Sequence, residues 1–377
     1  MTAVSREGIP LSGSFIAQVA APDRRVLVRT REPGGQAPVL LVPSLGEYPV
    51  YDDRLYHFML NDRVRNDCYT AAIGRHAPGR TVLDIGTGQE AVWALTAARA
   101  GARHVWAVEV LPEAARQARE AVARAGFADR VTVLEGLSTT IDLPERADVC
   151  VSEIIGNLGG AEGAGAVLRD AGIRLVRPGG VFIPHRSTTT IVALDLDHAA
   201  PGGSPGFAEL ALPYLEHVFS SVGRPFDVRA CIPELRRRAH LSGVAEVEPL
   251  DYGGYLAPEG TQDRELVITR RGTLHGFALG VRLWVAAADK PIDSLSQHCN
   301  WLPVYAPLSA GGLPVHRGDR LSITFTTTIS NDGVHPDYRL DGELRARTGT
   351  FPLSWTSTHH DDGFRSNSFY RDLFPVR

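Results

Sequence analysis

The sequence lacks any apolar run of about 18 residues, the length that a membrane-spanning helix needs. Residues 1–10 also lack the basic start and the long apolar stretch of a signal peptide, so we expect a cytoplasmic protein with no membrane partner. Positive charge is not in excess either, because 39 Lys and Arg stand against 43 Asp and Glu, a formal net charge of −4. Proteins that coat nucleic acids need clustered basic residues, so we expect no nucleic-acid partner.

Cysteine is scarce, and its spacing disfavours two kinds of small-domain architecture. The 4 cysteines lie far apart and form no Cys-x-x-Cys pair, which argues against a structural zinc site and against a disulfide scaffold. We expect reduced, mostly buried thiols.

The chain has 377 residues, 44% of them hydrophobic, so it can bury a large core and form roughly two or three domains.

The middle of the chain alternates β-branched segments with alanine-rich segments of helical periodicity. Strands are predicted over residues 81–86, 104–110, 130–136, 147–154 and 180–184, and helices over residues 89–100 and 113–125, with one or two more within residues 54–76. Strand and helix alternation at this spacing predicts right-handed crossovers and a parallel sheet. We therefore expect an α/β doubly wound, Rossmann-like domain over residues 54–185, preceded by an N-terminal segment over residues 1–53.

Residues 186–377 follow a different pattern, with β-rich segments separated by Gly, Pro and Asp. This pattern predicts a mostly antiparallel β domain, a barrel or a sandwich. A stretch rich in Gly and Pro over residues 199–205, followed by a helix-like segment over residues 207–217, interrupts the pattern and indicates an inserted arm. The clearest strand candidates of this half are residues 188–196, 265–269, 274–285, 320–329 and 337–345.

Asp84, Gly86 and Gly88 stand where the first predicted parallel strand gives way to a helix. Glycines at such a turn let the backbone approach a ligand, and the helix N-terminus offers free amides. Glu109 ends the next predicted strand, where its carboxylate can accept both hydroxyls of a ribose. Together they predict an adenosine-containing cofactor. A third glycine, which a dinucleotide-binding turn normally has, is replaced by the acidic segment Gln89-Glu90-Ala91.

The segment VLDIGTG, residues 82–88, resembles motif I of the class I S-adenosylmethionine (SAM) methyltransferases. The segment LVRPGG, residues 175–180, resembles the same class. The resemblance implies SAM as the cofactor, which carries an amino-acid tail and no phosphate. Methyl transfer from a sulfonium requires position and charge complementarity from the protein, so we expect no metal at the active site.

The segment SEIIGNLGGAE, residues 152–162, follows the fourth predicted parallel strand and resembles the double-glutamate loop of the protein arginine methyltransferases. In that family the paired glutamates hold the substrate guanidinium through bidentate, charge-assisted bonds. The resemblance maps this pair onto Glu153 and Glu162.

Residues 59–69 resemble the family's SAM-covering helix, whose arginine pairs with the SAM carboxylate and maps onto Arg65.

The resemblance extends, in order, over residues 48–343, and includes a family barrel strand at residues 274–277. It implies a Rossmann-like SAM domain, then a mostly antiparallel β-barrel domain over residues 186–377. It also implies that an arm within about residues 199–238 forms a homodimer.

The sequence departs from the family pattern at several positions. Asn300 stands where the family has the histidine of a Thr-His-Trp loop, and His298 lies two residues earlier, so either residue is a candidate for a catalytic role. Ser138 begins a Ser-Thr-Thr segment where the family often presents a glutamate to the adenine amine, and it is the candidate cofactor contact there. Gly159 and Gly160 replace bulky residues of the double-glutamate loop, which changes the predicted acceptor pocket.

These departures leave the acceptor open. The single lysine, Lys290, amid abundant arginine and alanine is typical of a GC-rich bacterial genome, and we find no acidic patch for basic protein tails. We therefore expect a small-molecule acceptor, specifically an indole methylated at C3 in bacterial alkaloid biosynthesis, with Glu153 accepting the ring N–H. The alternatives are a protein arginine N-methyltransferase and a non-catalytic SAM-binding interaction protein.

Overall fold

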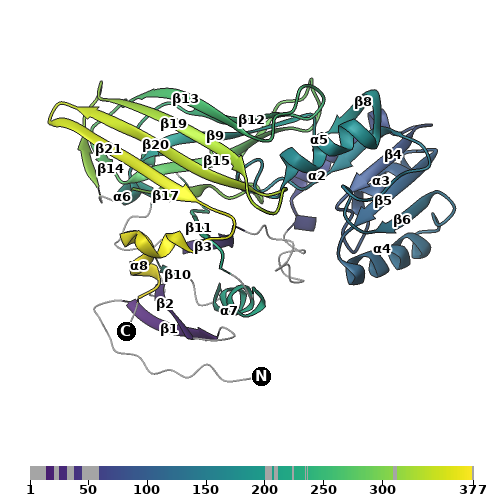
Figure 1. Ribbon diagram of the computed structural model, residues 1–377, viewed down its shortest axis with the longest axis horizontal. Coiled ribbons are helices and arrows are strands. Elements are labelled where there is room, and N and C mark those ends of the chain that lie inside the picture. The colour runs from purple at the N-terminus through teal and green to yellow at the C-terminus, as the bar shows by residue number, and fades with distance from the viewer. Residues whose placement is uncertain are drawn as a thin grey trace.

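The computed structural model describes residues 14–20, 25–31, 38–44, 59–199, 206–207, 211–222, 225–233, 235, 237–308 and 312–375. Two units dominate it: a parallel α/β unit, at the right of Figure 1, and a longer antiparallel β unit beside it. The expected fold class, a Rossmann-like domain followed by a mostly antiparallel β domain, is confirmed. None of the described helices combines the length and apolarity that a bilayer crossing requires.

The parallel sheet has 5 strands in the order β6-β5-β4-β7-β8. Strand β4 lies in the middle, and the chain moves outward from it first in one direction and then in the other. Ligands of open α/β sheets bind at this reversal, beyond the carboxyl ends of the strands. The strands are β4 (Thr81–Ile85), β5 (His104–Glu109), β6 (Val131–Glu135), β7 (Ala147–Ser152) and β8 (Val176–Ile183).

Strand β8 begins at Val176, earlier than the prediction over residues 180–184. It forms the edge of the sheet, where Pro178 can be accommodated because one side of the strand needs no ladder hydrogen bonds. The helices of this unit are α2 (Arg63–His76), α3 (Val92–Arg99), α4 (Pro112–Arg124) and α5 (Ala164–Arg174).

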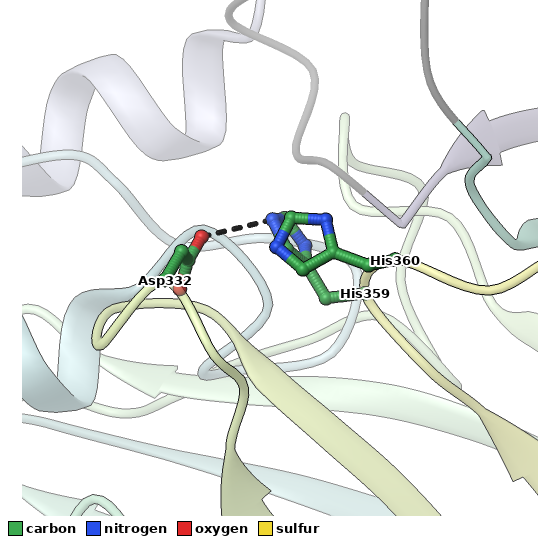
Figure 2. Close-up of side chains that lie close together, drawn as sticks. All are labelled: Asp332, His359 and His360. Carbon is green, nitrogen blue, oxygen red and sulfur yellow. Dashed lines mark ion pairs between the residues drawn. The ribbon is translucent and has the colours of Figure 1, made fainter.

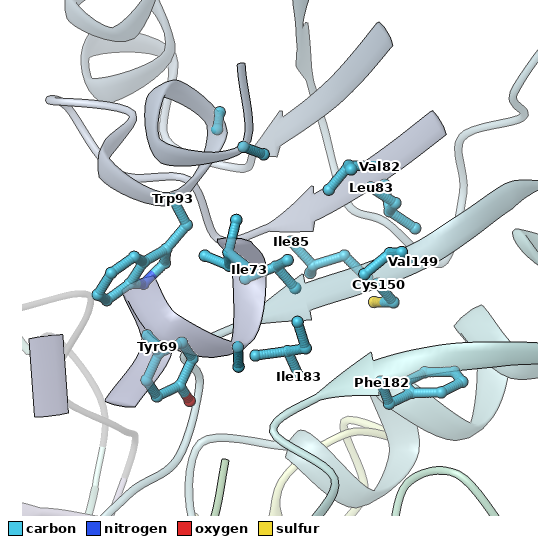
Figure 3. Close-up of a cluster of buried hydrophobic side chains, with 14 of the residues drawn as sticks. Tyr69, Ile73, Val82, Leu83, Ile85, Trp93, Val149, Cys150, Phe182 and Ile183 are labelled. Atoms are coloured by element: carbon cyan, nitrogen blue, oxygen red, sulfur yellow. The ribbon is translucent and has the colours of Figure 1, made fainter. Parts of the chain in front are cut away.

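The core of this unit joins the helices to the sheet. Figure 3 shows Ile73 of α2 and Trp93 of α3 beside Ile85 of β4, all of them buried. Tyr69 of α2 stacks on Trp93 with ring centroids 4.8 Å apart. Helix α2, although it precedes the first parallel strand, is therefore an integral part of this core.

The β unit contains a 10-stranded sheet and a 4-stranded sheet, with a core of buried side chains drawn from both. Strand β19 shows how the sequence places one face inward: Leu321, Ile323 and Phe325 alternate with more exposed threonines and serine and are buried. The larger sheet runs β1-β2-β10-β3-β11-β17-β15-β9-β12, with β16 paired to β15, and the smaller runs β13-β19-β20-β21.

Further strands β14 (Gly272–Leu274) and β18 (Leu313–Val315) form a separate pair. The strands of the two main sheets are β1 (Ser14–Ala20), β2 (Arg25–Arg31), β3 (Pro38–Pro43), β9 (Arg186–Leu194), β10 (Gly206–Phe207), β11 (Val228–Cys231), β12 (Ala245–Asp251), β13 (Gly260–Val267), β15 (Gly276–Trp284), β16 (Ile292–Asp293), β17 (Val304–Pro307), β19 (Arg320–Ile329), β20 (Pro336–Ala346) and β21 (Gly349–Ser357).

The N-terminal strands belong to the β unit, a feature that the sequence did not reveal. Strand β3 pairs with β10 and with β11, so the beginning of the chain joins the second half. Helix α7 (Leu212–Ser221) and helix α8 (Ser368–Leu373) complete a separate core with these strands. The short helix α6 (Leu196–Ala199) and the 3-10 turns η3 (Arg237–Ala239) and η4 (Gly363–Ser366) are the remaining helical elements described.

The predicted arm, residues 199–238, is therefore covered at least in part by its own chain. Leu215, Val218 and Phe219 of α7 are buried in this core. The helix begins at Leu212 and not at residue 207, because Phe207 lies in β10. Part of the arm and residues 48–58, where the family resemblance begins, lie outside the described residues.

Candidate active site

The glycine turn after β4 has the conformation that its sequence predicts. Gly86 and Gly88 take positive φ angles of 75° and 66°, a region that residues with a Cβ rarely adopt. A Cβ at Gly86 would lie 3.1 Å from the Cγ2 atom of Ile154, so the turn packs tightly against the segment after β7. Ala91, just before α3, also takes a positive φ of 47°. It thus adopts the left-handed backbone that a glycine usually supplies.

The Glu109 carboxylate lies beside this turn, so the two halves of the predicted cofactor site are adjacent. Its Oε2 atom accepts a hydrogen bond from the Gly88 amide at 2.9 Å, and its Oε1 atom accepts one from the Leu111 amide at 3.0 Å. The side chain is 7% exposed. The end of β5 is therefore fixed to the glycine turn by an anion.

Asp84 and Ser138 occupy supporting positions. The Asp84 side chain has no exposed surface, and its Oδ2 atom accepts a hydrogen bond from the Thr87 hydroxyl at 2.6 Å. Burial raises the pKa of Asp84 to about 7. Ser138 is also buried, and its carbonyl accepts a hydrogen bond from Arg174 at 2.8 Å. In this conformation Asp84 supports the turn through its bond to Thr87.

Arg65 forms an ion pair with Glu153, which brings two predicted site residues together. The Nη1 atom of Arg65 lies 2.6 Å from the Oε2 atom of Glu153, and both side chains are almost fully buried. Burial raises the pKa of Glu153, and the positive charge of Arg65 opposes that rise. The Nη2 atom of Arg65 donates to the Met59 carbonyl at 2.6 Å, and its Nε atom donates to the Asn66 side chain at 3.2 Å.

The start of α2 positions this arginine. Asp62 is the N-cap residue, and its Oδ1 atom accepts a hydrogen bond from the Arg65 amide at 3.1 Å. Its Oδ2 atom accepts a second one from the Asn300 amide at 3.0 Å. One carboxylate thus joins the helix that carries Arg65 to the segment that carries Asn300.

Glu153 and Glu162 begin and end a tightly folded loop. A Cβ at Gly156 would lie 2.8 Å from the Ala161 Cβ atom and 3.3 Å from the Glu162 Cγ atom, so the loop turns back on itself there. The Glu153 side chain is nearly buried, and Glu162 is partly buried. The compact loop keeps the two glutamates in one segment after β7.

Two neighbouring residues of the β unit, Trp301 and Leu302, fix this loop by hydrogen bonds. The indole Nε1 atom of Trp301 donates to the Ile155 carbonyl at 2.7 Å, and the Leu302 amide donates to the Asn157 side chain at 2.5 Å. Asn300, half buried, adjoins this contact, whereas His298 is exposed. Of the two candidates that the sequence left open, Asn300 lies beside the double-glutamate loop.

A buried glutamate of the β unit, Glu248, supports the same loop. Glu248 of β12 accepts hydrogen bonds from the Gly160 amide at 3.3 Å, from the Tyr338 hydroxyl at 3.1 Å and from the Thr189 hydroxyl. Burial raises its pKa. A Cβ at Gly160 would clash with the Glu248 Oε1 atom, so a larger residue there would displace the carboxylate from its present position. Gly160, which replaces a bulky family residue, therefore makes room for a buried carboxylate.

Sequence reasoning missed Asp62, Trp301 and Glu248 as residues that position the site. Asp62 had a usable signal, because aspartate directly before a helical segment is a preferred N-cap. Glu248 gave none, since an acidic residue in a strand is ordinarily exposed. Its role depends on which strands the chain brings beneath the loop.

Comparison with known proteins decides the family. The arginine N(omega)-methyltransferase of Streptomyces achromogenes subsp. streptozoticus is 30% identical over 285 residues, which cover 71% of this chain and 74% of that protein. The chain belongs to the arginine methyltransferase family. The family model of the ribosomal protein L11 methyltransferase (PrmA) also matches residues 67–183. The chain is therefore a SAM-dependent methyltransferase.

Other arginine methyltransferases also match, one in sequence over a shorter span and two in structure over most of the chain. The protein arginine N-methyltransferase PRMT10 of Oryza sativa subsp. japonica is 36% identical over 171 residues, 44% of each chain. The solved structure of Arabidopsis thaliana protein arginine methyltransferase 10 covers 83% of this chain and 98% of its own, with a TM-score of 0.64 and 22% identity. A Trypanosoma brucei PRMT1 enzyme-prozyme complex with AdoHcy gives a TM-score of 0.63 at 20% identity, over 80% of this chain and 98% of its own.

The residues at the glycine turn fit the SAM cofactor of this arginine methyltransferase family. Gly86 and Gly88 keep side-chain atoms away from the turn, and the nearly buried Glu109 carboxylate beside it would suit two ribose hydroxyls. Arg65 would suit the carboxylate of a methionine tail, but its guanidinium is bonded here to Glu153, Met59 and Asn66. The indole specificity expected from the sequence finds no support in these comparisons, which favour the arginine alternative.

Proposed function

We propose that this enzyme methylates a guanidinium nitrogen of arginine, as the free amino acid or within a peptide. The observation that carries the proposal is the bond at Glu153. Its carboxylate, in a nearly buried position, already accepts a hydrogen bond from the guanidinium of Arg65 at 2.6 Å. The same carboxylate chemistry suits a substrate guanidinium, with Glu162 as the second anion of the loop.

Two carboxylates match the chemistry of a guanidinium acceptor. A guanidinium is planar and offers several N–H donors, so a pair of anions can hold and polarise it and offset its charge. Glu153 would accept the proton that the reacting nitrogen loses. An indole offers one ring N–H and needs only one carboxylate, which leaves the second glutamate of the loop without a role.

The cofactor side would act by positioning. SAM, when bound, supplies the methyl group as an activated sulfonium. Glu109 would hold the ribose. The turn at Gly86 and Gly88 would let the cofactor lie close to the protein backbone. Arg65 would pair with the methionine carboxylate, for which it has to release the Met59 carbonyl or the Asn66 side chain.

The relatives support the same acceptor. The name of the Streptomyces relative specifies arginine, and those of the plant relatives specify protein arginine. The test is a panel of L-arginine, an Arg-Gly peptide, indole and tryptophan, each incubated with the enzyme and labelled SAM. We expect label in one or both arginine-containing acceptors. Label only in the indole acceptors would restore the indole hypothesis, and SAM binding without any transfer would favour a non-catalytic role.

We also propose a homodimer that involves the arm at about residues 199–238. The proposal rests on the family resemblance and on the separate core that α7 forms with the N-terminal strands. Light scattering at micromolar concentration should give about twice the chain mass of 40.8 kDa. A single species at the mass of one chain would contradict it.

A further inference from the structure

A cluster of two histidines and an aspartate lies outside the active site, in the β unit. Asp332 belongs to the turn between β19 and β20, and His359 and His360 follow β21. Their side chains converge, and a dashed line in Figure 2 joins Asp332 to His359. One ligand atom from each of the three residues lies within 4.8 Å of the other two.

The hydrogen bonds of His359 fix which nitrogen carries its proton. Its Nδ1 atom lies 2.8 Å from the Ser44 carbonyl oxygen, which can only accept, so Nδ1 is the protonated donor. In a neutral imidazole the Nε2 atom then carries a lone pair. That atom is fully buried, has no hydrogen-bond partner among the described residues, and lies 2.9 Å from the Oδ2 atom of Asp332. Two electron-rich atoms therefore face each other.

A cation between these atoms resolves the conflict. The Oδ1 atom of Asp332 accepts hydrogen bonds from the Val334 and His335 amides, each at 2.9 Å, while its Oδ2 atom faces His359. His360 offers a third ligand atom within 4.8 Å of the other two. Two imidazoles and a carboxylate form a donor set that a metal ion binds.

We propose that Asp332, His359 and His360 bind a zinc ion. Imidazole nitrogen and carboxylate oxygen are both zinc ligands, at about 2.0–2.2 Å from the ion. Two such ligand atoms in a tetrahedral site lie roughly 3.3–3.6 Å apart, so His359 and Asp332, now at 2.9 Å, have to separate by a few tenths of an ångström. His360 is half buried and needs to move inward, and water fills the fourth position on the exposed side of Asp332.

The surroundings of the cluster have the supporting bonds of a metal site. Metal-binding histidines usually donate their second N–H to a carbonyl or a carboxylate, as His359 does to Ser44. His335 reaches the same Asp332 carboxylate, with its Nδ1 atom 2.7 Å from Oδ2, and its ring stacks on that of His359 with centroids 4.3 Å apart. These contacts fix the orientation of two of the three ligands.

The zinc ion would fasten a turn that touches the active-site loop. Val334 in the β19–β20 turn packs so closely on Gly163 that a Cβ there would lie 2.5 Å from the Val334 Cγ1 atom. Gly163 directly follows Glu162. The ion therefore ties this turn to the end of β21 and to Ser44 after β3, and it stiffens the support of the double-glutamate loop without touching the reacting atoms.

The test measures zinc content and affinity in protein without a polyhistidine tag. Elemental analysis after dialysis against zinc chloride and gel filtration should find about one zinc per chain. Calorimetry should show that His360→Ala and Asp332→Asn each weaken zinc binding at least about 100-fold. Excess zinc should raise the melting temperature of the wild type by several degrees and leave that of both variants unchanged. Cobalt should give visible ligand-field absorption in the wild type only.

Asp197→Asn is the matched control. Asp197 belongs to the other described cluster of possible ligands, with Asp195 and His275, and it is 77% exposed, so its replacement should not disturb folding. This variant should bind zinc like the wild type, and SAM binding reports folding in all three variants. Equal zinc binding by the wild type and Asp332→Asn, no zinc binding by the wild type, or loss of zinc only in Asp197→Asn would each overturn the proposal.

Discussion

The two sides of the active site are built in different ways. On the cofactor side, the Gly88 amide in the turn after β4 donates to Glu109 at the end of the neighbouring parallel strand β5, 21 positions away. On the acceptor side, the loop from Glu153 to Glu162 is held by Glu248, 88 positions beyond Gly160, and by Trp301, 146 positions beyond Ile155. The cofactor side is local, whereas the acceptor side depends on the β unit.

This difference predicts a separation of effects. Changes in the β unit that loosen the double-glutamate loop should slow methyl transfer and leave SAM affinity nearly unchanged. Changes at the glycine turn should weaken SAM binding. Arg65 is the exception, because it contacts Glu153 and is also the proposed partner of the SAM carboxylate.

The largest effect on methyl transfer is expected at the acceptor glutamates. Glu153→Gln keeps the shape but replaces an anion with a neutral amide, so methyl transfer should fall by about 10² to 10³, or about 3 to 4 kcal/mol. For an arginine acceptor Glu162→Gln should be similarly severe, whereas for an indole it should be mild. Rate measurements at saturating SAM, with SAM affinity from calorimetry, give both values. Near wild-type turnover in Glu153→Gln would show that the loop has a purely structural role.

The next effect concerns Glu248. Its replacement by alanine leaves the Gly160 amide and the hydroxyls of Thr189 and Tyr338 without their acceptor, which should cost about 2 to 4 kcal/mol in the free energy of unfolding. Methyl transfer should fall while SAM affinity stays within a few fold. Glu246→Ala, on the same strand, removes partly exposed ion pairs and should cost less than about 1 kcal/mol. Equal losses of stability and of methyl transfer in the two variants would show that Glu248 has no special role in supporting the loop.

On the cofactor side, Glu109→Ala should weaken SAM binding by well over tenfold, because two charge-assisted hydrogen bonds contribute about 1.5 to 3 kcal/mol each. Glu135→Ala is the control. Glu135 ends the adjacent strand β6 at the paired position, and it is exposed. Calorimetry should find unchanged affinity for that control. If Glu109→Ala also retains full SAM affinity, the cofactor assignment fails.

The smallest effect is expected from Gly86→Ala, and its comparison with Gly79→Ala distinguishes backbone strain from loss of ligand contact. Gly86→Ala places a Cβ at a φ of 75°, which should cost about 1 to 2 kcal/mol of stability and also reduce SAM affinity. Gly79 has a similar φ of 71°, and a Cβ added there would have no neighbouring atom within 4 Å, so Gly79→Ala should show the backbone cost alone. Thermal unfolding and calorimetry on both variants provide the comparison. Matching SAM affinities would mean that the Gly86 turn does not approach the cofactor.

The structural features that depend on residues close together in the sequence were predicted from it. The parallel strands, the glycine turn and the acidic end of β5 follow from hydrophobic period and turn chemistry. The pairing of β3 with β10 and β11 could not be foreseen, because it joins segments well over a hundred residues apart whose local patterns allow many partners. The support of the double-glutamate loop by Glu248 was hidden for the same reason.

The comparisons favour the arginine alternative over the expected indole, and composition carries little information about the acceptor. Gly159 and Gly160 were interpreted as a change in the acceptor pocket. In the structure Gly160 makes room for the Glu248 carboxylate, and the Gly159 amide donates to the Thr189 hydroxyl at 2.8 Å. The small residues therefore serve the packing of the loop on the β unit. They give no reason to prefer an aromatic acceptor.

The most direct test of the account is to locate the transferred methyl group. The enzyme is incubated with SAM and with L-arginine or an Arg-Gly peptide, and the product is fragmented in a mass spectrometer. The account predicts a methyl group on a guanidino nitrogen of the wild-type product, and its near absence when Glu153→Gln is used under the same conditions. A methyl group on any other atom, or one that forms equally well with Glu153→Gln, would contradict it.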